Sequence, residues 1–465
     1  MRGIVVFPDR TGVSSEYFRL MLCLVLALSL CAAHTMGSQP LVLACLVGFL
    51  AISAVSSVEG LGIDVLLFFL PWSPLLKQRV GEVSLYTIAL ALACLIALAR
   101  RRFRVRPYQL AYPAILLSLT LLSKLFQGNA IDRGYLLFLF TLVLFPNLAT
   151  SDCRRRTPFS LTCLYFSLGV ISAALSAQLV ASNPSIAQFI NVESWAHVTR
   201  LSGYYGDANF YSAQINACIA GLLLVLVKET FAWRRAGCLG LLVTLLYCGL
   251  LSASKSFVIV CACEVGIWAA MLFRNSDNGR RNLTLLVAAA VVVLVALSTS
   301  AFQELLRILD NRFSYADSVS QITTGRSDVW LSYLDLLSRD TKLTLFGEGM
   351  TNVTLDVLRN KASHNTPIQL IFQLGILGAP VLVAWFACLL RGLLPARMRQ
   401  VDGWAVALLA VGVFMPWLGL DYLFFDELFL LPSFAARGVC GFSDAPPRCN
   451  GLGDPDATRL VGENT

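Results

Sequence analysis

Two segments of this chain bring basic side chains, a histidine and glycines into otherwise apolar sequence. The first reads HVTRLSGYYGDANFYSAQ and contains Arg200. The second runs from Thr323 to Leu377 and contains Arg326 and His364. Arginine binds phosphate and carboxylate oxygens through paired hydrogen bonds, and histidine is the side chain that titrates near neutral pH. Together these residue types predict an anion-binding site beside a group that can move a proton.

In the first segment, Arg200 precedes a Gly/Asp turn, and Asp207 or Asn209 is expected to cap the helix that follows. Lys255 lies in a turn between two later apolar runs, where a lysine is costly unless it reaches the interface or pairs with an anion. A second interpretation also fits the first segment. In it, Arg200 only marks a membrane interface, and nearby tyrosines form an aromatic belt: Tyr204, Tyr205 and Tyr211.

The second segment predicts a helix over residues 325–337 with Thr324 as its N-cap. The i, i+4, i+7 spacing places four residues on one face of that helix: Arg326, Trp330, Tyr333 and Leu337. The arginine on this face could reach outward to water along its aliphatic stem. It could equally bind an anion, and the spacing does not separate the two roles.

Further along, LFGEGM predicts a turn at Gly347 and Gly349 in which the backbone passes close to another group. His364 then precedes an apolar helix that has Asn365 or Thr366 as its cap and a proline in its first turn. A helix N-terminus of this kind attracts anions such as phosphate. His364 is therefore either a proton-transferring residue at the mouth of a helix or a neutral packing residue.

The composition defines the elements that must position these residues. The 465-residue chain is 57% hydrophobic and 14% charged, with a mean hydropathy of +0.70, whereas soluble domains carry roughly 25% charged residues. Apolar runs long enough to span a bilayer recur along it. We predict an all-α, polytopic transmembrane bundle of about 12–14 spans. The net charge of +8 comes from arginine clusters between apolar runs, which favours membrane topology over nucleic-acid binding.

If the segment from Arg100 to Arg106 is cytoplasmic, four later arginine clusters fall on the same side. The interrupted run Leu61–Trp72 must then cross the membrane if the N-terminus is also cytoplasmic, and it is either a short or broken span or a re-entrant piece. Loops 181–210 and 301–365 are expected on the outer side of the membrane, and loop 301–365 is expected to contain helices. We expect a single transmembrane domain over residues 1–442, followed by a disordered cytoplasmic tail over 443–465. The other runs are near 20–33, 41–55, 85–98, 110–125, 135–148, 159–180, 211–227, 239–251, 257–273, 283–298, 368–390, 404–420 and 423–434.

Other chemistries lack their motifs. The fourteen cysteines lie mostly inside apolar runs, where they behave as small hydrophobes, and there is no CxxC pair. Cys440 and Cys449 are expected in the cytoplasmic tail, where a disulfide is disfavoured. The outer loops contain no DxD motif, and the chain has no P-loop and no GxGxxG. We therefore expect no metal, no cofactor and no ATP-driven pump.

The motifs TTGRSDVW, LFGEGM and HNTPIQLIFQLGILG resemble the C-terminal signature of the O-antigen ligase family. RLSGYYGDANFYSAQ resembles an upstream element of that family, and the rest of the chain agrees in hydropathy. The resemblance implies a metal-independent, inverting, GT-C-like glycosyltransferase of lipopolysaccharide biosynthesis. Its donor would be a glycan on undecaprenyl diphosphate and its acceptor a sugar hydroxyl of lipid A–core, at the periplasmic face of the bacterial inner membrane.

The resemblance also implies roles for particular residues. His364 matches the family's essential histidine, and Arg200 and Arg326 match its outer arginines that bind the diphosphate. Lys255 stands where many members have arginine, so its place among the phosphate ligands rests on charge alone. Supporting residues would be Asp207, Asn209, Trp330, Gly347, Gly349 and Asn365.

Membrane lipids surround such an enzyme, and we expect it to act as a monomer without nucleic acid. Two rivals of the same class, a polysaccharide polymerase and a protein O-oligosaccharyltransferase, share the donor and differ in the acceptor. A rival of another class is a flippase or exporter of lipid-linked glycans. That function calls for polar residues through the middle of several spans, whereas we expect spans nearly free of charge. A structural scaffold is the fourth alternative.

Overall fold

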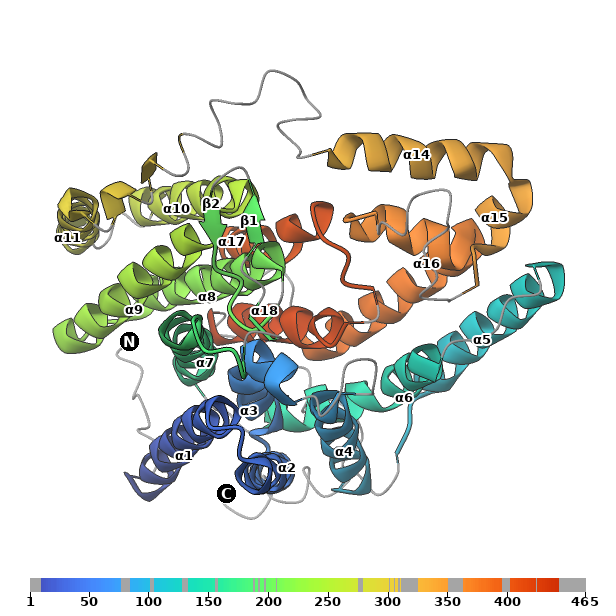
Figure 1. The fold of residues 1–465 in the computed structure, drawn as a ribbon, viewed down its shortest axis with the longest axis horizontal. Helices are drawn as coiled ribbons and strands as arrows, with labels where there is room; N and C mark the ends of the chain where they lie inside the picture. The colour runs from blue at the N-terminus through green and yellow to red at the C-terminus, as the bar shows by residue number, and fades with distance from the viewer. Residues whose placement is uncertain are drawn as a thin grey trace, which may run out of the picture.

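The structure is a computed structural model (Figure 1). It describes residues 10–76, 84–100, 104–127, 133–154, 158–274, 279–310, 325–349, 363–394 and 402–442, with short gaps at 187–188, 191–192, 196–197, 206, 301, 305, 308–309 and 424. The predicted tail over 443–465, Thr324 and Cys449 lie outside the described residues.

Long apolar helices dominate this part of the chain. Nine are long and apolar enough to cross a membrane: α1 (Arg10–Thr35), α2 (Gln39–Glu59), α5 (Pro107–Gln127), α6 (Arg133–Arg154), α7 (Phe159–Val180), α8 (Ala208–Lys228), α9 (Ala232–Leu251), α10 (Lys255–Arg274) and α16 (Thr366–Leu393). An all-α, multi-pass membrane protein is thereby confirmed, while the count of 12–14 spans and the sidedness stay predictions.

Further helices and one hairpin complete the described part of the chain. The apolar ones are α3 (Gly62–Phe69) with the 3-10 helix η1 (Leu70–Leu76), α4 (Leu85–Arg100), α11 (Gly279–Ser298) and α17 (Gly403–Phe414) with η5 (Met415–Leu418). The others are α14 (Arg326–Arg339), α15 (Thr341–Phe346) and α18 (Glu427–Phe442). Loop 181–210 contains an antiparallel hairpin of β1 (Glu193–Trp195) and β2 (Val198–Arg200). In its backbone register Glu193 lies opposite Arg200.

The interrupted run Leu61–Trp72 is buried throughout and forms α3 and the first part of η1. At one end the Ile63 N–H donates to the Asp152 carboxylate at 2.7 Å. At the other end the Leu75 carbonyl lies 3.1 Å from Nε2 of His34, in the last turn of α1. This short element therefore connects the end of α6 with the end of α1, and whether it crosses the membrane or is re-entrant stays a prediction.

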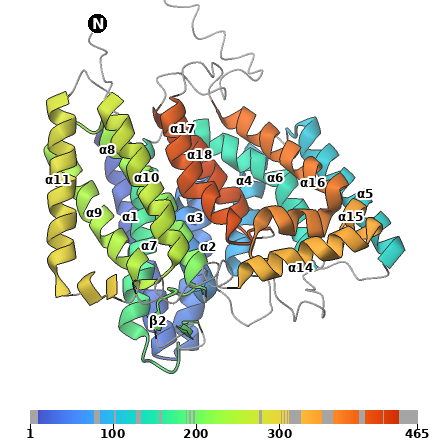
Figure 2. The ribbon, with the colours of Figure 1, turned by 90° about the horizontal axis from the view of Figure 1, so that it is seen from above.

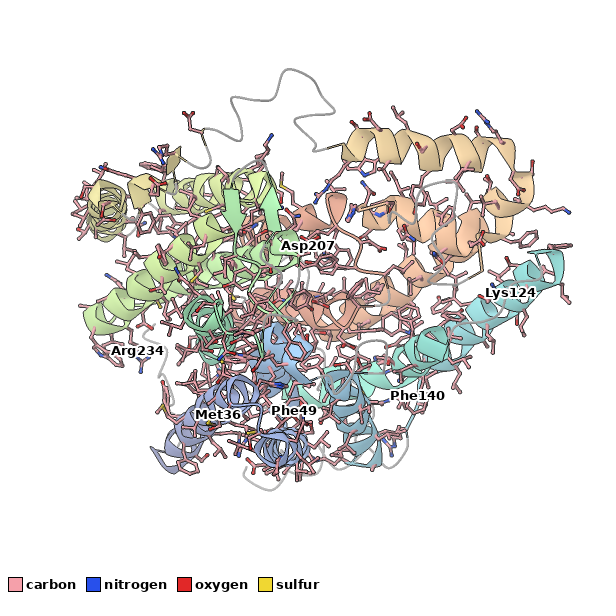
Figure 3. All side chains as sticks on the ribbon, in the orientation of Figure 1. Met36, Phe49, Lys124, Phe140, Asp207 and Arg234 are labelled. Atoms are coloured by element: carbon pink, nitrogen blue, oxygen red, sulfur yellow. The ribbon has the colours of Figure 1, made fainter. Side chains whose placement is uncertain are left out.

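The most buried of the nine long helices is α8, and α7, α9, α10 and α17 pack against it (Figure 1). Phe49 lies inside the bundle, whereas Phe140 points outward and is 43% exposed (Figure 3). Leu125 on α5 and Leu179 on α7 are more than four-fifths exposed. Exposed apolar side chains on membrane-spanning helices are what lipid would cover.

Two expectations for the C-terminal part are wrong. The last apolar helix begins at Glu427, not at residue 423, because Asp421 accepts a hydrogen bond from the Leu423 N–H and holds a turn there. The helix then continues to Phe442, so Cys440 belongs to its last turn and not to a tail. Its Sγ donates to the Leu393 carbonyl at the end of α16.

Candidate active site

Arg200 is the centre of the first group of polar residues. Its side chain is buried, with Nε donating to the Ser252 carbonyl at 3.0 Å and Nη2 to Asn209 Oδ1 at 3.2 Å. Asp207 caps α8 as predicted, since its Oδ1 accepts both the Asn209 N–H and the Asn209 Nδ2. Ser254 Oγ donates to the same amide oxygen at 3.0 Å. Asp207, Asn209 and Ser254 thus fix the guanidinium near the start of α8.

The aromatic-belt interpretation is wrong for two of its three tyrosines. Tyr204 and Tyr211 are each 1% exposed. The Tyr204 hydroxyl lies 3.0 Å from Cys31 Sγ and donates to Ser176 Oγ inside the bundle. These rings therefore pack in the core and do not sit at a lipid headgroup layer.

Lys255 is the first residue of α10 and is half-buried. It follows the tight turn from Ser252 to Ser254, in which Ala253 has the left-handed φ of 46°. The Leu201 N–H donates to the Leu251 carbonyl at the end of α9, at 3.0 Å. The segment after β2 is thereby joined to the α9–α10 turn, so Arg200 and Lys255 lie at the same end of the bundle.

Arg326 begins the second group. Gly325, with φ 78°, is the N-cap of α14, so the prediction that Thr324 caps this helix is wrong. Arg326 Nη1 donates to the Gly419 carbonyl at 2.7 Å, and Trp330 Nε1 donates to the Ser363 carbonyl at 2.9 Å. Tyr333 and Leu337 bury against Phe372 of α16. The four predicted residues do share one face, and that face turns toward α16 and the 418–420 segment.

His364 stands at the entrance of α16. Asn365 caps the helix as predicted, accepting the Ile368 N–H at 3.0 Å while its Nδ2 donates to the Leu418 carbonyl at 2.9 Å. His364 itself has φ 48°, in the left-handed region. Non-glycine residues held there cluster at functional sites, where the surrounding structure imposes the strain. The hydrogen bonds of Ser363 and Asn365 on either side of His364 supply that constraint.

Gly347 and Gly349 lie against α16, which is not the continuous helix expected over 368–390. The helix is broken at Gly375, where φ is 69° and ψ is 173°. The Glu348 N–H donates to the Phe372 carbonyl at 2.8 Å, and the Gly349 N–H donates to the Gln373 carbonyl at 3.1 Å. The carbonyls freed by the break are thereby satisfied. The close approach predicted for LFGEGM is thus to the backbone of α16, beside which Figure 2 shows the preceding helix α15.

The segment 418–422 joins the two groups. Besides Arg326 and Asn365, Thr366 also binds it, with Oγ1 donating to the Leu420 carbonyl at 2.7 Å. The Tyr422 ring then lies 5.0 Å from the ring of Phe210, in the first turn of α8. Residues separated by more than a hundred positions in the chain therefore gather around the start of α8.

Asp421 is a site residue that was not predicted from the sequence. Burial raises its pKa from 3.8 to about 7, against the opposing effect of the Leu423 N–H that it accepts. Burial and the Asp421 charge together raise the pKa of Tyr333 to about 12. A carboxyl that changes charge near neutral pH can take or give a proton. The only signal in the sequence was an acidic residue directly after an apolar run.

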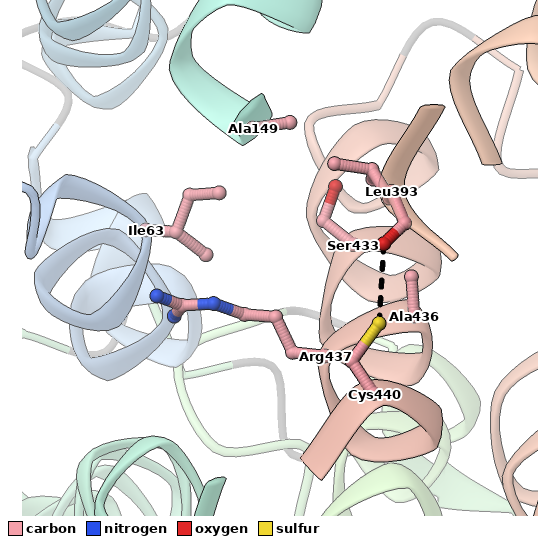
Figure 4. A pocket seen from close by; sticks show the side chains of 7 residues that line it. All are labelled: Ile63, Ala149, Leu393, Ser433, Ala436, Arg437 and Cys440. Atoms are coloured by element: carbon pink, nitrogen blue, oxygen red, sulfur yellow. Dashed lines mark hydrogen bonds between the residues drawn. The ribbon is translucent and has the colours of Figure 1, made fainter. Parts of the chain in front are cut away.

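The opposite end of the bundle also contains charged groups. A cavity of about 10 Å³, room for about one water, lies between α3, α6, α16 and α18 (Figure 4). Beside it Arg437 Nη1 donates to Asp64 Oδ1 at 2.6 Å, and Nη2 donates to the Asp152 carbonyl at 3.3 Å. Both aspartates and Glu264 are fully buried. These three acids are exceptions to the expectation of spans nearly free of charge.

Comparison with known proteins gives no assignment, because no family model and no curated protein matches the chain. The O-antigen ligase family therefore stays a prediction. Within the described ranges, no three His, Cys, Asp or Glu side chains are grouped as a metal site.

Proposed function

We propose that this protein is a membrane glycosyltransferase of the O-antigen ligase kind. The observation that supports the proposal most is the gathering of Arg200, Lys255, Arg326 and His364 at one end of a membrane bundle. Three cationic side chains at the end of a bundle of membrane helices suit a diphosphate carried on a lipid. The donor would be a glycan on undecaprenyl diphosphate, and the acceptor a sugar hydroxyl of lipid A–core.

The chemistry needs two functions from the protein. The arginines and the lysine stabilise the negative charge that develops on the departing diphosphate, and such electrostatic stabilisation commonly accelerates a reaction more than any other single effect. His364 or Asp421 receives the proton of the acceptor hydroxyl as the new glycosidic bond forms. A single displacement of this kind inverts the anomeric centre, and the leaving group takes the charge without a redox cofactor.

Transfer between purified components tests this proposal. The protein is mixed with undecaprenyl-diphosphate glycan and lipid A–core in the presence of EDTA, and ligated product is measured. We expect transfer by the wild type, and a loss of about 100-fold or more in His364→Ala and Arg326→Ala, as for other groups that stabilise transition-state charge.

Matched controls separate a site defect from general damage. Arg307 is an exposed arginine outside the site, and His34 is a histidine bonded to a backbone carbonyl within the bundle. Arg307→Ala and His34→Ala should retain most of the transfer activity. Full activity of the His364 and Arg326 variants would contradict the assigned roles.

The same assay distinguishes the rivals. Lengthening of the glycan on its lipid carrier would identify a polymerase, and transfer to a protein acceptor would identify an oligosaccharyltransferase. Buried Asp64, Asp152 and Glu264 give the flippase or exporter alternative a structural basis that it lacked in the sequence. Movement of lipid-linked glycan across a liposome membrane, without any transfer, would favour that alternative.

A further inference from the structure

Glu264 lies deep within α10, far from the site described above. It follows Lys255 by nine residues, which places it about 14 Å along the helix axis. The helix is one of the long apolar helices, and the Glu264 side chain is fully buried. Neither carboxyl oxygen has a hydrogen-bond partner among the described residues. A group of this kind inside a membrane helix calls for a specific explanation.

The carboxyl occupies a notch where three helices meet. Gly412 of α17 forms the floor of this notch, because a Cβ there would lie 2.6 Å from Glu264 Oε1. The same Cβ would lie 2.5 Å from the Cβ of Ala220 and 3.2 Å from the carbonyl oxygen of Asn216, both on α8. Glycine at 412 is thus what allows α8, α10 and α17 to close around the carboxyl.

The described surroundings of the notch offer no positive charge. Among the described residues, titratable groups that interact with Glu264 are the thiols of Cys218 on α8 and of Cys261 and Cys263 on α10. No ion pair includes Glu264 within the described ranges. An acceptor borders the notch, namely the carbonyl oxygen of Asn216, and Oδ1 of the same residue is buried without a bonded partner among the described residues.

An ionised carboxylate in such a place would be strongly disfavoured, since it would lose its hydration and face other oxygens. A protonated acid carries no net charge and can donate its O–H to an acceptor. We propose that α8, α10 and α17 form an intramembrane proton-binding site, in which Glu264 holds one proton as a neutral carboxylic acid.

The position of the notch gives the proton a structural consequence. The helices that meet there carry parts of the candidate active site at their ends: α8 starts after Asp207, α10 starts at Lys255, and α17 leads through η5 to Gly419. Loss of the proton would place an unpaired charge at their junction. The carboxyl thus acts as a positioning residue for the bundle, whatever reaction the site performs.

Infrared spectroscopy of the purified full chain tests the proposal directly. A protonated carboxylic acid has a carbonyl stretch above the amide and carboxylate bands, and it shifts when H₂O is replaced by D₂O. In the difference spectrum between wild type and Glu264→Gln we expect loss of an acid band and no loss of carboxylate bands. The matched control is Glu304→Gln, an exposed glutamate that pairs with Arg307, which should lose only carboxylate bands.

Thermal unfolding adds a second measurement. Glutamine is the neutral isostere of the proposed acid, so Glu264→Gln should fold and melt within a few degrees of the wild type, whereas Glu264→Lys should melt far lower or fail to fold. Loss of carboxylate bands in Glu264→Gln, or failure of that variant to fold, would overturn the proposal. Neither measurement uses glycan transfer, so the two proposals stand or fall separately.

Discussion

Asp421 gives the candidate site a charge that depends on pH. Because its pKa is raised from 3.8 to about 7, the folded protein binds this proton more tightly than the unfolded chain does. The stability that the carboxyl contributes is therefore fully present below about pH 4 and is lost as the pH rises through about 7.

The loss of stability with rising pH predicts how Asp421→Asn should behave. The amide stays neutral and keeps an oxygen for the Leu423 N–H, so the variant should gain stability over the wild type at pH 8, on the order of 1–3 kcal/mol, and little at pH 4. Melting temperatures of both proteins across this pH range measure the difference. Asp328→Asn on the exposed face of α14 serves as control. An equal gain at both pH values would contradict the assigned pKa.

At the residue scale, the helix caps could be predicted and the tertiary contacts could not. Asp207 and Asn365 cap their helices through N–H groups two or three residues away, so local sequence holds the information. The hydrogen bonds from Arg200 and Ser254 to Asn209 join the end of β2, the start of α8 and the α9–α10 turn, the last of these 45 positions away from Asn209. Nothing in the spacing of these residues signals such a meeting.

At the element scale, two glycines decide how α14 and α15 sit on α16. A Cβ at Gly375 would lie 2.2 Å from the Leu345 carbonyl oxygen, and one at Gly347 would lie 2.4 Å from the Gln373 carbonyl oxygen. Both glycines also have positive φ, which disfavours any side chain. Because Arg326 and Trp330 belong to α14, this contact helps to position them beside His364.

We therefore expect Gly375→Ala to lower both stability and transfer. The strained backbone and the close contact together should cost roughly 2–4 kcal/mol, and a displaced α14 should reduce transfer by about 10-fold or more. Gly240→Ala on α9, where a Cβ meets nothing within 4 Å, should be neutral or slightly stabilising. Wild-type melting and activity in Gly375→Ala would show that α16 tolerates a side chain at its break.

The positions of the long helices could be predicted from hydropathy, but the break in α16 could not. Apolar runs such as Phe159–Val180 coincide with their helix because burial in lipid demands an unbroken set of backbone hydrogen bonds. A glycine inside a run of helical period does not by itself indicate a break. Gly375 needs the Glu348 and Gly349 N–H groups, from another element, to satisfy the carbonyls that the break releases.

At the scale of the whole molecule, Arg437 joins the last helix to the first third of the chain. Its ion pair with Asp64 is buried, with 12% and 0% of the two side chains exposed, and it also contacts Thr162 of α7. Hydropathy could not predict this link, because polar residues inside the bundle are stabilised only by partners that the fold supplies.

Removal of Arg437 alone should destabilise the protein far more than removal of both charges of the Arg437–Asp64 pair. Arg437→Met leaves Asp64 uncompensated and should destabilise the protein by about 3–5 kcal/mol, and Asp64→Asn in the same chain should restore part of the loss. Melting in detergent measures both variants. Arg339→Met, which breaks an exposed pair with Asp335, should cost under about 1 kcal/mol. Equal effects at Arg437 and Arg339 would refute a structural role for the buried cluster.

The short element α3–η1 has a consequence for biosynthesis. It is too short and too enclosed to settle in lipid alone, and α7 is one of the helices that cover it. The Gly169 carbonyl accepts the Trp72 Nε1 proton across 97 positions of sequence, and Gly169 itself lies against the Phe68 backbone. During translation, residues 62–76 can therefore reach their native position only after α7 has left the ribosome. A nascent chain arrested before Phe159 should hold them in an environment open to water or to the insertion machinery.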